Sequence, residues 1–97
     1  MKIVWSPLAM EKVSAIAEFI ALDKPSAAIN WANSVFDLAE SIGSQPGMGR
    51  EVPELIGTGY RELIFGNYRI IYKLSDTIQI LTVRNCRQLL SIGDDEL

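Results

Sequence analysis

The side chains with the clearest capacity for chemistry in this sequence are its arginines. Two flank the stretch from residue 60 to 84 and the others lie inside it; the set is Arg50, Arg61, Arg69, Arg84 and Arg87. A guanidinium group binds phosphate or carboxylate oxygens through paired N–H donors. Such arginines, clustered on one surface, indicate contact with a nucleic acid or with an acidic protein surface.

Other catalytic residue types are scarce. The chain has no histidine and a single cysteine, Cys86, which excludes Ser–His–Asp and Cys–His arrangements and most zinc sites. No neighbouring base makes Cys86 a persuasive nucleophile, and one cysteine forms no intrachain disulfide. We therefore expect no metal, no cofactor and no small-molecule substrate.

Length and charge narrow the class of protein further. The 97 residues suit one domain, residues 1–97. The net charge is −3 and the pI is about 4.8, whereas a domain that binds mainly phosphate backbones is usually basic. No secretory signal and no membrane-length apolar run is evident. We expect a cytoplasmic, soluble domain without membrane contact, with a solvated acidic tail at its end.

Three antiparallel strands are predicted around the arginines. Residues rich in β-branched and aromatic types run over 60–65, 68–74 and 77–83. Gly66-Asn67 suits a two-residue hairpin loop because both residues tolerate positive φ. Ser75-Asp76 breaks the second pair of strands less strongly.

Side-chain alternation assigns these residues to two faces. The first loop predicts that Phe65 faces Tyr68, Leu63 faces Ile70 and Arg61 faces Tyr72. The core face then holds Leu63, Phe65, Tyr68, Ile70, Tyr72 and Leu74, with Arg61 at its edge. The second face is mixed and holds Tyr60, Glu62, Ile64, Arg69, Ile71 and Lys73, with Ile78, Ile80 and Thr82 added if Ser75-Asp76 is a two-residue loop. This mixture predicts partial cover by the chain's own tail or by a partner.

The segment before these strands predicts one strand and two helices. Lys2–Trp5 is short and apolar and suits an edge strand. Ser6-Pro7 begins a helix that runs to about Leu22. Pro25 begins a second helix with its own apolar stripe, and Gly43 is a plausible C′ residue. Because about three residues connect them, the helices form an antiparallel hairpin.

The remaining segments are less regular. Residues 50–55 include at most a short extended piece, limited by Pro53. Cys86–Ile92 is predicted to form one or two helical turns, followed by frayed terminal residues. The predicted plan is β-α-α-β-β-β, an α+β domain with a helical hairpin packed on a small antiparallel sheet.

Five segments, spread in matching order and spacing over almost the whole chain, resemble the ParE branch of the ParE/RelE toxin superfamily, which includes plasmid stabilisation proteins. They are Trp5-Ser6-Pro7, Pro46 to Arg50, Pro53-Glu54-Leu55, Arg61 to Tyr72 and Ile78 to Val83. The resemblance implies the RelE/ParE-like fold and a type II toxin that a cognate antitoxin wraps and neutralises. It also implies one of two activities. ParE-type members inhibit DNA gyrase, and RelE-type members cleave mRNA in the ribosomal A site.

The chemistry of RNA cleavage favours the ParE branch. Cleavage through the 2′-hydroxyl needs a base, an acid and cations around the scissile phosphate. This chain has Glu62 and Leu63 where RelE-type enzymes place lysine, and no tyrosine or histidine follows Ile80. We therefore favour a gyrase-binding protein without catalysis. The alternative is a ribosome-dependent mRNA endoribonuclease using Arg69, Arg61 and Arg87.

A third hypothesis is a degenerate member that binds antitoxin without toxicity. It is motivated by Asn85, which stands where the ParE family commonly has histidine. Asparagine cannot titrate, but it still forms hydrogen bonds.

The predicted sites follow from these hypotheses. Target contact is assigned to Arg61, Arg69, Arg84, Arg87 and Arg50, and antitoxin contact to Ile64, Ile71, Ile80, Glu62 and Lys73. Simpler roles stay open. Arg61 could cover Tyr72 at the sheet edge, and Arg69 could pair with Glu62. Arg50 could be a loop arginine near Glu51 and Glu54, and Arg84 and Arg87 could solvate the terminus.

Overall fold

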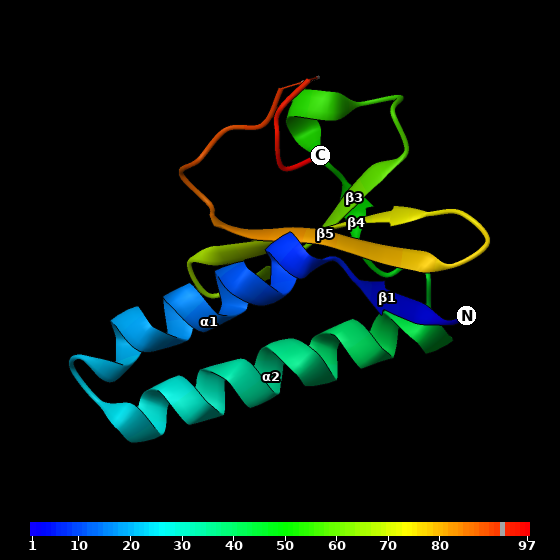
Figure 1. The fold of residues 1–97 in the computed structure, drawn as a ribbon. Helices are drawn as coiled ribbons and strands as arrows, with labels where there is room; N and C mark the ends of the chain where they lie inside the picture. The colour runs from blue at the N-terminus through cyan, green and yellow to red at the C-terminus, as the bar shows by residue number, and fades with distance from the viewer. Residues whose placement is uncertain (92) are drawn as a thin grey trace.

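The computed structural model describes residues 1–91 and 93–97. Within these residues, five strands form one sheet in the order β1-β5-β4-β3-β2, and two long helices lie together on one side of it (Figure 1). The elements are β1 (Ile3–Trp5), α1 (Pro7–Ala21), α2 (Pro25–Ser44), β2 (Arg50–Glu51), the 3-10 helix η1 (Pro53–Leu55), β3 (Tyr60–Phe65), β4 (Tyr68–Leu74) and β5 (Ile78–Asn85). The predicted order is confirmed, with β2 as a short addition. The sheet is mixed and not wholly antiparallel as predicted, because β1 pairs with β5 in parallel. No helix in the described part of the chain is long and apolar enough to cross a membrane.

Ser6 fixes the start of α1 on the sheet. Its hydroxyl accepts the N–H of Ala9 at 3.0 Å and donates to the carbonyl of Leu81 at 2.9 Å, while Pro7 occupies the first turn. This is the N-cap that the Ser-Pro pair predicts. Because Leu81 belongs to β5, the same residue that caps the helix also sets its position over the sheet.

The end of α2 differs from the prediction. Gly43 lies inside the helix, which continues to Ser44 with Gln45 as its C-cap, so Gly43 is not the C′ residue. A Cβ at Gly43 would lie 3.1 Å from the carbonyl oxygen of Met1 and 3.3 Å from Cδ1 of Ile3. The glycine therefore allows the start of the chain to pass close to α2. The amino group of Met1 donates to the carbonyl oxygen of Gly43 at 2.9 Å.

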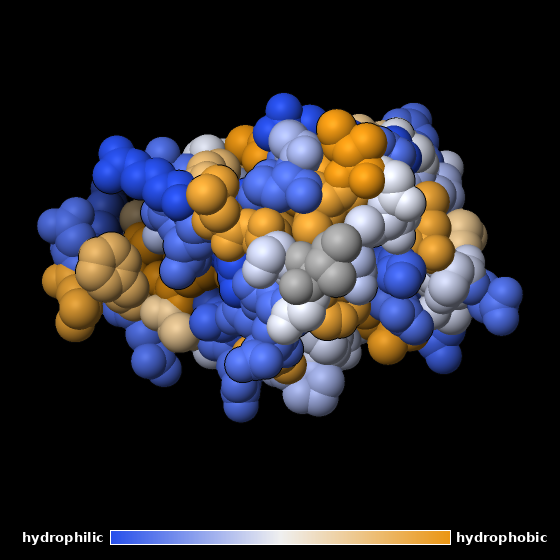
Figure 2. Space-filling model, turned by 90° about the horizontal axis from the view of Figure 1, so that it is seen from above, coloured by the Kyte–Doolittle hydropathy of each residue, from blue (hydrophilic) through white to orange (hydrophobic). Residues whose placement is uncertain are grey.

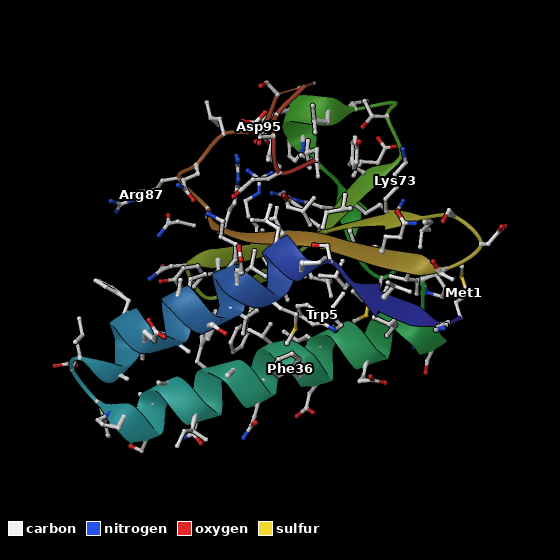
Figure 3. The ribbon with its side chains drawn as sticks, in the orientation of Figure 1. Met1, Trp5, Phe36, Lys73, Arg87 and Asp95 are labelled. Carbon is white, nitrogen blue, oxygen red and sulfur yellow. The ribbon has the colours of Figure 1, made fainter. Side chains whose placement is uncertain are left out.

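The main core lies between the helical hairpin and the sheet. It is built from apolar residues of α1, α2, β4 and β5, with Val35, Ile42, Ile70, Tyr72 and Ile80 among those without solvent exposure. At one edge of this core, Trp5 of β1 packs against Phe36 of α2, with ring centroids 5.1 Å apart (Figure 3). The predicted core face of the first hairpin is confirmed, since every apolar residue assigned to it belongs to this cluster or packs against it.

The first hairpin has the predicted register. Phe65 pairs with Tyr68, Leu63 with Ile70 and Arg61 with Tyr72. Of the two loop residues only Gly66 has positive φ, at 58°. Positive φ at the first loop position alone is the pattern of a type II′ turn.

The second hairpin corrects the prediction for Ile78 and Ile80. Leu74 pairs with Ile78 and Tyr72 with Ile80, so three residues, not two, form the loop. This shift of one residue moves both isoleucines to the core face. A bulge between Ile71 and Tyr72 then breaks the register, and Thr82 returns to the second face as predicted.

The end of the chain also differs from the prediction. Residues 86–88 form a turn and a bend, residues 89–91 are irregular, and none of them is helical. Ile92, the last residue of the predicted helical segment, lies outside the described residues. The terminal residues are packed and not frayed. Leu90 and Leu97 contact a second apolar cluster, on the face of the sheet away from the helices, that contains Val52, Leu55 and Ile71. Figure 1 shows η1 and the tail together on this side.

Candidate interaction site on the second sheet face

Two arginines face each other on neighbouring strands of the second sheet face. Arg69 on β4 pairs directly with Arg84 on β5. Like charges directly opposite one another destabilise a sheet when nothing neutralises them. The structure places carboxylates from three other parts of the chain around this pair, namely from η1, β3 and the tail.

Arg69 is almost completely buried, with 4% of its surface exposed. Its Nη1 and Nη2 atoms donate to Oε2 and Oε1 of Glu54 at 2.7 and 3.0 Å. Nη2 also lies 2.5 Å from Oε1 of Glu62; this ion pair lacks hydrogen-bond geometry, so that oxygen is ion-paired but not hydrogen-bonded. The predicted Arg69–Glu62 pair is therefore confirmed, and Glu54 is an additional partner.

These contacts determine the protonation of the cluster. Burial acts to lower the pKa of Arg69, but its hydrogen bond to Glu54 and the charge of Glu62 outweigh burial and raise it. The hydrogen bond from Arg69 is the main cause that lowers the pKa of Glu54 from 4.5 to about 2, against the opposing effect of burial. Arg69 and Glu54 are thus both ionised at neutral pH.

Arg84 is held by the tail. Its Nη2 atom donates to both carboxylate oxygens of Asp94, at 2.7 and 2.9 Å, and its Nε atom pairs with Glu96. Lys12 of α1 adds a contact of 2.8 Å to Glu96, and the hydroxyl of Thr82 donates to Glu96 at 3.3 Å. The acidic tail is therefore bound to the sheet, and the prediction of a solvated tail is wrong.

The carboxylates of the tail titrate accordingly. Burial acts to raise the pKa of Glu96, but the hydrogen bonds from Lys12 and Arg84 outweigh it and the pKa is lowered. A backbone N–H from Glu96 lowers the pKa of Asp94, with Arg84 adding to the effect. The pKa of Arg84 is raised, since its bonds to Glu96 and Asp94 outweigh burial.

Arg61 lies on the other face of the sheet and binds a loop. It donates to the carbonyls of Gly47 and Gly49, at 3.1 and 2.5 Å. Tyr72, its partner across the hairpin, accepts the N–H of Gly49 at 2.9 Å and donates to the carbonyl of Pro46 at 3.0 Å. Arg61 therefore fastens the 46–49 loop over Tyr72, which matches the simpler of its two predicted roles.

The two flanking arginines are the accessible ones. Arg50 has 63% of its side chain exposed although its Nε donates to Oε2 of Glu62 at 2.7 Å; its carboxylate partner is thus neither Glu51 nor Glu54. Arg87 is exposed and projects away from the ribbon in Figure 3. Asn85, in the position where histidine was expected, accepts the N–H of Arg87 at 2.9 Å and so shapes the turn after β5.

The residues predicted to contact an antitoxin are divided by burial. Ile64 is 48% exposed, and Lys73 is half-buried with its ammonium 4.8 Å from the ring of Tyr60. Glu62 and Ile71 lie beneath the chain's own residues, and Ile80 lies under the helices. In this conformation only Ile64 and Lys73 are open to a partner.

Two grooves border the arginine pair. One, of about 270 Å³, has Arg50, Ile64, Cys86 and Leu89 in its wall. The other, of about 290 Å³, lies between α1 and the end of β5, with Phe19, Tyr68 and Arg84 in its wall. Figure 2, which looks onto the tail side, shows hydrophilic and hydrophobic side chains interspersed there. Within residues 1–91 and 93–97, no three His, Cys, Asp or Glu side chains are grouped to hold a metal ion.

Sequence reasoning missed the carboxylates from η1 and the tail that bind Arg69 and Arg84, and the lysine that also binds Glu96. Glu54, Asp94, Glu96 and Lys12 were not assigned to any site. Asp94 and Glu96 meet at Arg84 because a turn at residues 95 and 96 joins them, with the N–H of Leu97 bonded to the carbonyl of Asp94. No pattern along the sequence indicates which cation they meet.

The comparisons with known proteins agree with this architecture. The family model described as "ParE toxin of type II toxin-antitoxin system, parDE" matches residues 3–90. A solved structure described as "Chromosomal ParDE TA system from P. aeruginosa" has a similar fold, with a TM-score of 0.73, 19% sequence identity, and coverage of 88% of this chain and 95% of that one. No protein with a curated description matches at a significant level. The family match spans nearly the whole sheet and both helices, and the chain therefore belongs to the ParE toxin family of type II toxin–antitoxin systems.

Proposed function

We propose that this chain is a toxin that binds DNA gyrase and inhibits it by protein–protein contact, without catalysing bond cleavage itself. Membership of the ParE family supports the proposal. The observation that carries the choice of mechanism is the placement of Arg61 and Arg69, the core of the alternative nuclease set, on opposite faces of the sheet. Side chains of residues 61 and 69 point apart by alternation and bind different parts of the chain.

The endoribonuclease alternative needs cations that meet at one phosphate. Arg69 is neutralised by Glu54 and Glu62, and Arg61 is occupied by loop carbonyls. Arg87 is the one member of that set without such a tie among the described residues. The arrangement thus supports a binding surface rather than a catalytic centre.

Target contact is proposed to centre on Arg50 and Arg87. Both are exposed, and they flank a region that also presents the aliphatic side chains Ile64 and Leu89. Arginine beside exposed aliphatic groups is a common composition for protein interfaces. Arg69 and Arg84 contribute indirectly, because they hold in place the segments that carry these exposed residues.

A cognate antitoxin is proposed to cover the apolar tip of the helical hairpin together with Ile64 and Lys73. Phe19, Leu22 and Ile29 are 69%, 86% and 63% exposed, and exposed apolar groups of this size mark protein interaction sites when they lie together. Phe19 and Leu22 border the same surface hollow. Co-purification with the product of an adjacent gene, and its loss on Phe19→Asp, would support this assignment; unchanged co-purification would contradict it.

The gyrase proposal is tested by DNA supercoiling with purified gyrase. We expect inhibition and a trapped cleavage complex with the wild-type chain, and weaker inhibition with Arg50→Ala and Arg87→Ala. Lys24→Ala is a matched control, since Lys24 is an exposed cation in the connection between α1 and α2. Unchanged supercoiling with no trapped complex at high toxin concentration would refute gyrase as the target. Cut mRNA in programmed ribosomes would instead favour the endoribonuclease.

A further inference from the structure

The end of the chain crosses the second sheet face as a strap, which we define as residues 88–91 and 93–97. Side chains of the sheet and η1 hold its backbone. Arg69 donates to the carbonyl of Gln88 at 3.3 Å, Arg84 donates to that of Leu89 at 2.9 Å, and the N–H of Leu90 donates to Glu54 at 3.0 Å. The strap is thus bound as a peptide ligand is bound, through backbone atoms and a few anchors.

The anchors of the strap are two carboxylates and two leucines. Asp94 and Glu96 both bind Arg84, and Glu96 also binds Lys12. Leu90 and Leu97 pack on the apolar cluster around Ile71. The surface beneath the strap therefore binds the side chains of Asp94, Glu96 and Leu97, whereas Asp95 is exposed.

The strap is not part of the sheet. Its backbone–backbone hydrogen bonds within the described residues are local, from Gln88 to Asn85, from Asp94 to Ser91 and from Leu97 to Asp94. No strand ladder joins it to the sheet, in contrast to the five paired strands. Segments held mainly by side-chain contacts open at lower free energy than paired core strands.

From these contacts we infer that the surface formed by Lys12, Thr82 and Arg84 with the neighbouring apolar cluster is a docking site for an acidic segment of a partner protein. The strap occupies the site in cis. The partner segment has two carboxylates one residue apart followed by an aliphatic residue, the chemistry that the strap itself displays at 94–97. Such a segment binds in trans by displacing the strap, so the strap must open before the partner binds. The tether gives the strap a high effective concentration, which lowers the apparent affinity of the partner segment. This inference stands apart from the identity of the toxin's target.

The test uses the full chain and a short peptide. In Asp94→Asn/Glu96→Gln the strap loses both anions and Arg84 is freed; Asp95→Asn is the matched control, because Asp95 is exposed. The probe is the peptide Gly-Asp-Asp-Glu-Leu, acetylated and amidated, and the control peptide has Asn and Gln at the positions of Asp94 and Glu96. Binding is followed by NMR titration of the ¹⁵N-labelled chain.

We expect saturable shifts at the amides of Lys12, Thr82 and Arg84 in the double variant. The affinity should be at least ~10-fold weaker for the Asp95→Asn chain and for the control peptide, and should be lost when Arg84→Gln is added. Equal binding of both peptides, or shifts located elsewhere, would overturn the inference. So would a wild-type dimer that forms by exchange of tails, since the occupant would then be a second copy of the chain.

Hydrogen exchange of the wild-type chain tests the same inference without any variant. The amide of Leu90 is bonded to Glu54 of η1, outside the strap, whereas the amides of Glu96 and Leu97 are bonded to Asp94 within it. If the strap opens independently, the amide of Leu90 exchanges at least ~10-fold faster than the paired amides of β4. Exchange of Leu90 at the same rate as those amides would mean that the strap opens only with global unfolding, which would refute a displaceable occupant.

Discussion

Replacing Arg69 by methionine should destabilise the chain strongly, whatever the variant does to toxicity. Arg69 is 4% exposed and Glu62 is 1% exposed, so the substitution leaves a buried carboxylate facing a neutral side chain. Glu54 loses both of its bonds to the guanidinium and keeps the N–H of Leu90. Methionine is similar in length, so the loss is mainly electrostatic.

The expected magnitude follows from the burial. Breaking a buried ion pair by removing one partner costs about 3–5 kcal/mol. A chain of this length has a total stability of about 5–15 kcal/mol. The variant should therefore fold marginally, with a melting temperature lower by at least about 12 °C. In contrast, Arg69→Met/Glu62→Met should recover about 2 kcal/mol relative to Arg69→Met, because the buried carboxylate of Glu62, which would keep only its bond to the exposed Arg50, is also removed.

Urea unfolding followed by circular dichroism measures both quantities. Arg87→Met provides the control, since Arg87 is an exposed arginine, and its effect should stay within about 0.5 kcal/mol. A cost below about 1 kcal/mol for Arg69→Met, or a double variant equal to the sum of the two single variants, would refute the buried network. Loss of activity on Arg69→Ala would accordingly be no evidence for catalysis unless the variant remains folded.

Three further outcomes follow from the same geometry. Gly49→Ala should cost about 1–3 kcal/mol in urea unfolding, because its Cβ would lie 2.6 Å from the backbone oxygen of Glu62. Gly47→Ala is the control, since no atom lies within 4 Å of its Cβ, and it should change stability by less than about 0.5 kcal/mol. Equal effects of the two substitutions would contradict the reasoning. Tyr72→Phe should cost about 1–3 kcal/mol, since the buried N–H of Gly49 and the carbonyl of Pro46 lose their partner, and a neutral result in the same assay would exclude that role. The pKa of Glu54 is lowered from 4.5 to about 2, so its contribution to folding stability is complete above pH 4.5 and is lost as pH falls towards 2. After allowance for solvent screening this contribution is about 1–2 kcal/mol. The difference in stability between wild type and Glu54→Gln should therefore shrink over that pH interval, and a constant difference would contradict the reasoning.

The elements were predictable because local signals specify them. Ser6-Pro7 starts α1 and Pro25 starts α2 at the predicted residues. The first hairpin register follows from Gly66-Asn67, whose turn allows one pairing of the flanking strands. In each case the residues that decide the structure are adjacent in sequence, so a propensity or a turn preference is sufficient.

The predicted register of the second hairpin was wrong for a physical reason. Its loop has three residues and its strands contain a bulge, and neither feature has a strong local signal in Ser75-Asp76-Thr77. A shift of one residue exchanges the faces of a strand. Ile78 and Ile80 were therefore assigned to the partner-binding face, although the apolar requirement of the core under α1 places them inside.

The site was predictable only in part, because charges were identified without their partners. Arginine content indicated a functional surface, yet four carboxylates of the same chain bind Arg69 and Arg84, namely Glu54, Glu62, Asp94 and Glu96. These partners come from segments up to 15 residues away along the chain. Their meeting depends on the fold as a whole, which no local pattern encodes.

The two facing arginines are neutralised inside the molecule, so the cations that this acidic chain exposes beside them are different residues. Each central guanidinium is neutralised by carboxylates of the chain itself, which lowers the repulsion between strands β4 and β5 and fixes η1 and the strap to the sheet. The positive charges that remain accessible to solvent are those of the exposed arginines Arg50 and Arg87. A partner that supplies its own carboxylates to Arg84 therefore competes with Asp94 and Glu96, while a partner that meets Arg50 and Arg87 does not. The two modes of binding differ in one measurable respect, since only the first should release the strap and increase hydrogen exchange at Leu90, whose N–H is bonded to Glu54 of η1.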